Sequence, residues 1–175
     1  MADTWSASSA EDRVVVGIAS QLVAAQQTLA VAESAAGGLV CHRITAVPGS
    51  SSWFLGGVVV YSSLAKERWL GIGREALRAT GAVSPEAVLT LARAVRRVLG
   101  STWGIAETGI AGPQTGRRSA KPAGLAYLAA VGEVGGRQIE SVVEVSTGSD
   151  DRSANRAAFA EALLRLLLDC LTGRR

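Results

Sequence analysis

The sequence predicts an α/β sandwich with a mixed sheet, and two patterns lead to this fold class. Segments with helical periodicity alternate with short apolar runs along the first part of the chain, which is the order of helices packed on a sheet. Further on, two apolar runs flank the glycine-containing segment 133–137, which predicts a hairpin connection. Because hairpin strands are antiparallel, the sheet should contain both strand directions.

The expected helices have recognisable ends. Ser8 and Glu11 have the spacing of a capping box, which favours a first helix over residues 10–27. The run Ser84-Pro85-Glu86 combines a capping hydroxyl, a first-turn proline and an acid favoured by the helix dipole. Gly100 is the expected end of that helix. The other helices are expected over residues 39–46, 63–70 and from about 150 to 173.

Five strands are expected between these helices. Gly56 and Gly57 inside the second strand predict a bulge or a close backbone contact. Binding sites in α/β sheets gather beyond strand ends, so we expect a site at the turns over residues 34–38, 61–66 and 108–113. The strands are expected through Val31 and over residues 53–61, 102–108, 123–131 and 138–145.

Length and composition favour one domain. The chain has 175 residues, of which 48% are apolar, enough for a sizeable core. We expect residues 1–9 to be a flexible tail and residues 10–175 to form a single domain. The net charge is +3 and the basic residues are scattered, so a nucleic-acid partner is not expected.

Cysteine usage and hydropathy suggest a cytoplasmic protein. Cys41 and Cys170 have no metal or redox spacing, which is typical of reduced thiols. No apolar run reaches the roughly 18 residues of a membrane span, and the N-terminus lacks a signal-peptide pattern. The apolar last helix and the scattered tryptophans are compatible with a homodimer, which is the expected oligomer.

The turn after the first strand is the segment most suited to chemistry. It reads Glu33-Ser34-Ala35-Ala36-Gly37-Gly38 and leads into a helix. A hydroxyl there faces unpaired amides and the positive end of a helix dipole, where an alkoxide or a bound anion is stabilised. The alternative is that Ser34 is only the N-cap of the helix and the glycines only a tight turn.

Several kinds of active site are disfavoured. His42 is the only histidine and lies eight residues after Ser34, about 12 Å along a helix axis, so a Ser-His-Asp triad is not expected. No group of side chains has metal-ligand spacing, and no Walker A or G-x-G-x-x-G motif is present. The remaining candidates are a serine with a lysine base, or a site that binds without reacting.

Lys66 and Tyr61 follow the second strand and are the candidate partners of Ser34. A lysine acts as a base only when burial or a nearby cation lowers its pKa, and a tyrosine hydroxyl could relay the proton. The alternatives are a solvated helix lysine and a strand-end tyrosine in water.

Arg152 and Arg156 open the last helix one turn apart. A positive charge there opposes the helix dipole, and two such charges repel. A phosphate held between them would remove both penalties. The alternative is neutralisation of Arg152 by Asp150 and Asp151 at the surface.

Several stretches taken together resemble the CinA C-terminal domain. The resemblance begins with Ala32-Glu33-Ser34-Ala35-Ala36-Gly37-Gly38 and extends over roughly residues 14–171. The further matching stretches are Gly49-Ser50-Ser51 with Phe54 and Gly57, Tyr61-Ser62 with Ala65-Lys66, Gly81-Ala82-Val83-Ser84, Thr108-Gly109-Ile110-Ala111-Gly112-Pro113, Lys121-Pro122 with Gly124, and Asp151-Arg152 with Arg156.

The resemblance implies a three-layer α/β/α sandwich with a mixed, mostly parallel sheet of about five strands. It also implies a nicotinamide-nucleotide amidohydrolase, which deamidates nicotinamide mononucleotide for pyridine-nucleotide recycling. Ser34 would be the nucleophile, assisted by Lys66 and Tyr61, while helix-end amides would stabilise the oxyanion. No metal and no organic cofactor is implied. The implied substrate-binding residues are Glu33, Ala36, Gly37, Gly38, Ser63, Thr108, Gly109, Ile110, Ala111, Gly112, and, for the 5′-phosphate, Arg152 and Arg156.

This chain departs from the family pattern in three places. The family reads Glu-Ser-Cys-Thr-Gly-Gly and Tyr-Ser-Asn, where this chain has Ala35, Ala36 and Ser63. The loop after Pro113 carries Arg117 and Arg118 in place of acidic residues. Two further functions therefore stay open beside the deamidase. One is a nucleotide-binding or competence and DNA-repair partner without turnover, and the other is a hydrolase for another amide.

Overall fold

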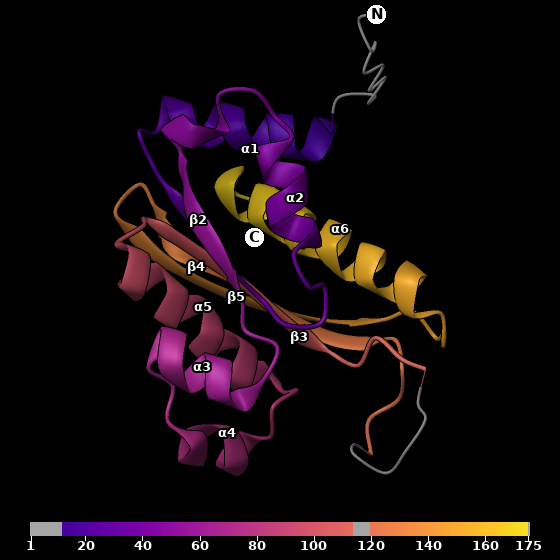
Figure 1. The fold of residues 1–175 in the computed structure, drawn as a ribbon. Coiled ribbons are helices and arrows are strands. Elements are labelled where there is room, and N and C mark those ends of the chain that lie inside the picture. The colour runs from indigo at the N-terminus through magenta and orange to yellow at the C-terminus, as the bar shows by residue number, and fades with distance from the viewer. Residues whose placement is uncertain (1–11, 114–119, 175) are drawn as a thin grey trace, which may run out of the picture.

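A five-stranded sheet runs through the middle of the molecule in the order β2-β1-β3-β4-β5 (Figure 1). The structure is a computed structural model and describes residues 12–113 and 120–174. β1 is parallel to both β2 and β3, whereas β4 is antiparallel to both β3 and β5. The sheet is mixed, as predicted, but half of its pairs are antiparallel, so "mostly parallel" overstates it. The strands are β1 Leu29–Glu33, β2 Phe54–Val59, β3 Trp103–Gly109, β4 Leu125–Val134 and β5 Arg137–Ser146.

Helices cover both faces of this sheet and give the three-layer sandwich. One layer contains α1, α2 and α6, and the other contains α3, α4 and α5 (Figure 1). Each layer encloses its own apolar core against the sheet, which is how both faces of a central strand become buried. The helices are α1 Arg13–Ala24, α2 Leu39–Thr45, α3 Ser63–Leu70, α4 Arg74–Thr80, α5 Pro85–Leu99 and α6 Arg152–Leu171, with a 3-10 turn at Ser50–Ser52.

The edge strand β2 confirms the expected close contact at its glycines. The pairing register shifts between Leu29 and Ala30, which indicates a bulge opposite them in β2. A Cβ atom added to Gly57 would lie 2.2 Å from the Cys41 Sγ atom and 3.2 Å from the Val31 carbonyl oxygen. Only glycine therefore lets α2 lie this close to β2.

The predicted ends of α3 and α5 agree with the structure. Both helices begin after a serine whose hydroxyl accepts an amide hydrogen bond, Ser62 for α3 and Ser84 for α5. Gly100 ends α5 in a left-handed conformation, the usual role of a glycine at that position.

The structure differs from the sequence-based expectations at three elements. The N-cap of α1 is Asp12, so α1 begins later than expected, and Ser8 and Glu11 lie outside the described residues. α2 has Gly38 as its N-cap, so Ser34 does not cap it. α4 was not expected because it is short and follows Gly73, which offers no capping side chain.

None of the helices within residues 12–113 and 120–174 combines the length and the apolar character that crossing a membrane requires.

Candidate active site

The three turns expected to form a site line one cavity of about 360 Å³. They follow β1, β2 and β3, which run parallel and so end at the same edge of the sheet. The start of α6 adds one side chain to the wall. The lining residues are Ser34, Ala35, Tyr61, Lys66, Ala82, Val83, Thr108, Gly109, Ile110, Ala111 and Arg152.

Ser34 and Lys66 meet inside this cavity. Ser34 follows β1, and Lys66 lies in the first turns of α3. The Lys66 Nζ atom donates a hydrogen bond of 3.3 Å to the Ser34 Oγ atom, and the two residues are only 3% and 8% exposed. Burial lowers the pKa of Lys66, while the nearby Glu107 carboxylate acts in the opposite direction. A serine hydroxyl therefore faces an amine whose loss of a proton is favoured by burial.

Glu107 lies under the serine loop and is fully buried in β3. Its carboxylate accepts hydrogen bonds from the amides of Ser34 at 2.5 Å, Ala35 at 3.1 Å and Ala36 at 2.8 Å. Burial raises the pKa of Glu107 to about 7, although these amides favour the ionised form. These three amides of the serine loop therefore already have a carboxylate partner.

Glu33 has a similar structural role at the start of α2. This fully buried carboxylate accepts hydrogen bonds from the amides of Gly38 at 2.8 Å, Val40 at 3.1 Å and Cys41 at 2.9 Å. These are the amides that a helix N-terminus leaves without partners. Both oxygens of Glu33 therefore face the start of α2, and Glu33 does not line the cavity.

Arg152 and Tyr61 form the rim of the cavity. The Arg152 guanidinium donates to the Tyr61 hydroxyl and to the Gly112 carbonyl, each at 2.9 Å. Tyr61 is 64% exposed, so its hydroxyl lies where solvent enters the cavity. This pair joins the start of α6 to the turns after β2 and β3.

Arg156 lies behind the serine loop and does not line the cavity. It donates to the Ala36 carbonyl through Nε at 3.1 Å and Nη2 at 2.9 Å, and to the Gly37 carbonyl at 3.4 Å. The donors of Arg156 therefore face the main chain of the serine loop. Arg152 and Arg156 contact different loops rather than a common point.

The turn after β3 is fixed from two sides. The Thr108 hydroxyl donates to the Ala82 carbonyl at 2.7 Å, which places the segment before α5 in the cavity wall. Asn155 is buried and donates to the Ala111 carbonyl at 2.9 Å. Arg117 and Arg118 lie outside the described residues.

A model of the CinA C-terminal domain matches residues 11–171. The chain belongs to this family. Its curated relatives include a CinA-like protein of Chlorobium phaeovibrioides, 46% identical over 83% of this chain and 34% of the relative. Another, from an Anaeromyxobacter species, is 43% identical over 86% of this chain and 36% of the relative. The chain spans about a third of the length of these relatives.

Solved structures of CinA-type proteins have the same fold. The competence/damage inducible protein CihA of Agrobacterium tumefaciens is 32% identical and superposes with a TM-score of 0.82, covering 91% of this chain and 94% of CihA. A CinA superfamily protein of Enterobacter cloacae is 30% identical, with a TM-score of 0.79 and 90% of each chain covered.

Not every residue expected to contact substrate lines the cavity of this CinA domain. Ala36 is fully buried, and Gly37 and Gly38 form the turn behind Ser34. Ser63 is exposed at the start of α3. Within the described part of the chain, the implied binding residues outside the cavity wall are Glu33, Ala36, Gly37, Gly38, Ser63, Gly112 and Arg156.

Glu107 is the residue that sequence reasoning missed. The available signal was a carboxylate inside a mostly apolar strand, since a buried charge is costly unless it has partners.

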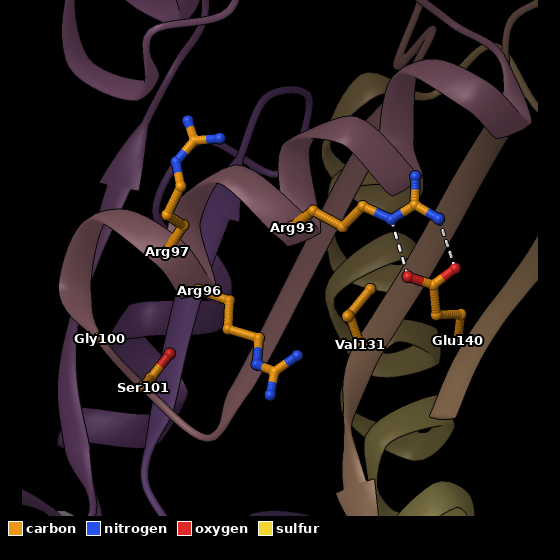
Figure 2. Close-up of a pocket in the computed structure, with 7 residues that line it drawn as sticks. All are labelled: Arg93, Arg96, Arg97, Gly100, Ser101, Val131 and Glu140. Carbon is orange, nitrogen blue, oxygen red and sulfur yellow. Dashed lines mark hydrogen bonds and ion pairs between the residues drawn. The ribbon is translucent and has the colours of Figure 1, made fainter. Parts of the chain in front are cut away.

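A second cavity of about 420 Å³ lies at the far end of α5 (Figure 2). The Arg93 guanidinium pairs with Glu140 at 2.5 and 2.7 Å, and Arg97 donates to the Leu70 carbonyl at 3.1 Å. Figure 2 shows the guanidinium groups of Arg93, Arg96 and Arg97 pointing in different directions. They do not converge on one ligand position, so the Ser34 cavity is the better candidate.

Proposed function

We propose that this CinA domain is an amidohydrolase that deamidates nicotinamide mononucleotide. The observation that carries the proposal is the buried contact between the Lys66 amine and the Ser34 hydroxyl. A buried lysine beside a serine in a cavity is an arrangement suited to nucleophilic catalysis. The family resemblance supplies the substrate, and this part of the proposal rests on the resemblance.

The reaction proceeds in two halves. Neutral Lys66 takes the proton of the Ser34 hydroxyl while Oγ attacks the carboxamide carbon and the carbonyl π electrons move to oxygen. The resulting ammonium of Lys66 lies beside the new centre, where its charge offsets that of the oxyanion. It then gives its proton to the leaving nitrogen, the C–N bond breaks and ammonia departs. Water attacks the acyl-serine with Lys66 again as base, releasing nicotinate mononucleotide and restoring Ser34.

Arg152 is proposed to bind the 5′-phosphate of the substrate. Its guanidinium lies on the cavity wall, and such a group suits phosphate oxygens. Tyr61, its hydrogen-bond partner on the rim, is proposed to orient the substrate and assist proton transfer. Arg156, whose donors face the loop carbonyls, is proposed to support the loop instead.

The substrate assignment is tested by comparing ammonia release from nicotinamide mononucleotide, nicotinamide riboside and nicotinamide. We expect the mononucleotide to have the highest kcat/KM. The Arg152→Ala variant should lose most of this preference over the riboside, whereas Arg156→Ala should reduce the rates on both. Equal rates on all three amides in the wild type would contradict phosphate recognition.

A second candidate function is nucleotide binding without turnover. It is favoured by the occupation of the Ser34, Ala35 and Ala36 amides by Glu107, which removes an amide-based oxyanion site from the loop. Calorimetric titration with nicotinamide mononucleotide separates the two functions. Binding by the wild type without ammonia release supports the binder, whereas release that Ser34→Ala abolishes supports the hydrolase.

A further inference from the structure

We propose that Glu107 is the positioning residue of this site, holding the Ser34 loop through three consecutive amides and thereby fixing the hydroxyl against Lys66. This inference rests on the proposed function, because it assigns Glu107 a role in the reactivity of Ser34. Glu107 does not line the cavity wall and acts through the loop.

The loop depends on Glu107 because the two side chains that follow Ser34 offer no polar contacts. Ala35 and Ala36 follow Ser34 and carry only methyl groups. Their amides and that of Ser34 converge on one carboxylate from the neighbouring strand. Successive amides that point to one place form an anion-binding concavity, and here a side chain of the same chain fills it.

Arg156 holds the same loop from the opposite side. Glu107 accepts the amide hydrogen of Ala36, while Arg156 donates to the Ala36 carbonyl. One peptide segment is therefore fixed by a carboxylate from β3 and by a guanidinium from α6. With both contacts in place the Ser34 backbone has little freedom to move. This matters for the reaction because a displacement of about 1 Å in a reacting group can lower the rate by on the order of a hundredfold.

The charge of Glu107 also acts on Lys66. Glu107 favours the charged amine, opposing the effect of burial on the pKa of Lys66. Other charged or titratable groups around this pair include Glu33, whose charge raises the pKa of Glu107, and Tyr61 and Arg152 in the cavity wall. Removing the negative charge of Glu107 therefore lowers the pKa of Lys66 further.

Two variants separate the hydrogen bonds from the charge. Glu107→Gln removes the charge and replaces one acceptor oxygen by a donor group that faces an amide. Glu107→Asp retains the charge but is shorter by one methylene. Glu140→Gln is the matched control, because Glu140 pairs with Arg93 on an exposed part of β5. Circular dichroism establishes that each variant is folded.

The test measures the rate at which a fluorophosphonate probe labels Ser34, located by peptide mass spectrometry, together with kcat and KM on nicotinamide mononucleotide. For Glu107→Gln we expect labelling and kcat to fall by on the order of a hundredfold, with KM changed by less than about threefold. Glu140→Gln should match the wild type. If Glu107→Gln does not fold, Glu107→Asp provides the same comparison, with a smaller loss expected.

The pH profile distinguishes this role from simple support of the fold. The acid limb of the labelling rate should move to lower pH in Glu107→Gln and stay near the wild-type position in Glu107→Asp. A folded Glu107→Gln protein with wild-type labelling, or one in which only KM rises, would overturn the proposal.

The labelling experiment also separates this inference from the proposed function. Labelling of wild-type Ser34 without deamidation would refute the proposed substrate and leave the role of Glu107 testable by the probe. No labelling and no deamidation by the wild type would overturn both proposals.

Discussion

A serine hydroxyl is a weak nucleophile at neutral pH, and Lys66 is the base that contacts the Ser34 hydroxyl among the residues that the structure describes. An ordinary lysine has a pKa of about 10.4 and is almost wholly charged at pH 7. Burial lowers the pKa of Lys66, which enlarges the neutral fraction that can accept the serine proton. At the scale of single residues, the proposed chemistry therefore depends on the low exposure of one amine.

The pH dependence of kcat/KM tests this role of Lys66. The neutral amine is the active form, so kcat/KM should rise with pH and reach half of its plateau below the ordinary lysine pKa of about 10.4. Lys66→Met should reduce kcat/KM by on the order of a thousandfold. Arg68→Met changes an exposed cation on the same helix and should have no effect. A wild-type profile with its midpoint above the ordinary lysine value would contradict the account.

Glu107 should make the stability of the protein depend on pH. Its pKa rises from an ordinary value of 4.5 to about 7, mainly because of burial. The folded protein therefore retains a proton that the unfolded chain loses, and the associated stability is complete below pH 4.5 and lost as pH rises through 7. As pH rises from 4.5 to above 7, the wild-type free energy of unfolding should fall, relative to that of Glu107→Gln, by on the order of 3 kcal/mol. Each unit of pKa shift corresponds to about 1.4 kcal/mol. Urea unfolding across this range measures it, and a constant difference between the two proteins would be the contrary result.

At the scale of elements, the close approach of α2 to β2 sets how the helix that follows the Ser34 loop packs on the sheet. Gly57 permits this approach, since a Cβ atom there would meet the Cys41 sulfur and the Val31 carbonyl. Gly57→Ala should destabilise the fold by about 1 to 3 kcal/mol, the usual cost of overpacking. Gly73→Ala is the matched control, because nothing lies within 4 Å of a Cβ atom there. Thermal unfolding measures both, and equal melting temperatures would refute the packing argument.

Local signals predicted some elements and missed others. α3 and α5 were predictable because a serine cap opens each and a glycine follows each. α4 was not, because Gly73 gives its start no capping side chain. The meeting of Ser34 and Lys66 follows from the rule that parallel strands end at one edge of the sheet.

The supporting contacts of the site could not be predicted in the same way. Glu107 bonds to amides more than 70 residues earlier in the chain, and Arg156 to a carbonyl 120 residues earlier. No local pattern encodes such pairs. Arg156 lies in the first turns of α6, where an arginine can bind phosphate, yet its donors face the main chain of the serine loop.

At the scale of the whole molecule, the structure changes the reason for expecting a dimer. The large apolar side chains of α6, such as Phe159 and Leu163, are buried in the core of the same chain. Exposed apolar side chains include Leu55 on the edge strand β2 and Trp69 on α3, which are 46% and 57% exposed. An unpaired edge strand with apolar side chains is suited to association.

The homodimer stays a prediction that light scattering can test. Size-exclusion chromatography with light scattering should give twice the chain mass of 18.0 kDa. Leu55→Lys should shift the protein towards the monomer, whereas Val23→Lys, at another exposed apolar position on α1, should not. A single 18.0 kDa species at all concentrations would refute the dimer.

The central claim is that Ser34 and Lys66 together deamidate nicotinamide mononucleotide. The most direct measurement is the formation of ammonia and nicotinate mononucleotide by the wild type, by Ser34→Ala and by Lys66→Met, with Ser63→Ala as the control. The account predicts that the wild type and Ser63→Ala each form ammonia and nicotinate mononucleotide in equal amounts. Ser34→Ala and Lys66→Met should form almost none of either product. Deamidation that persists in Ser34→Ala, or that is absent from a folded wild-type protein, would contradict it.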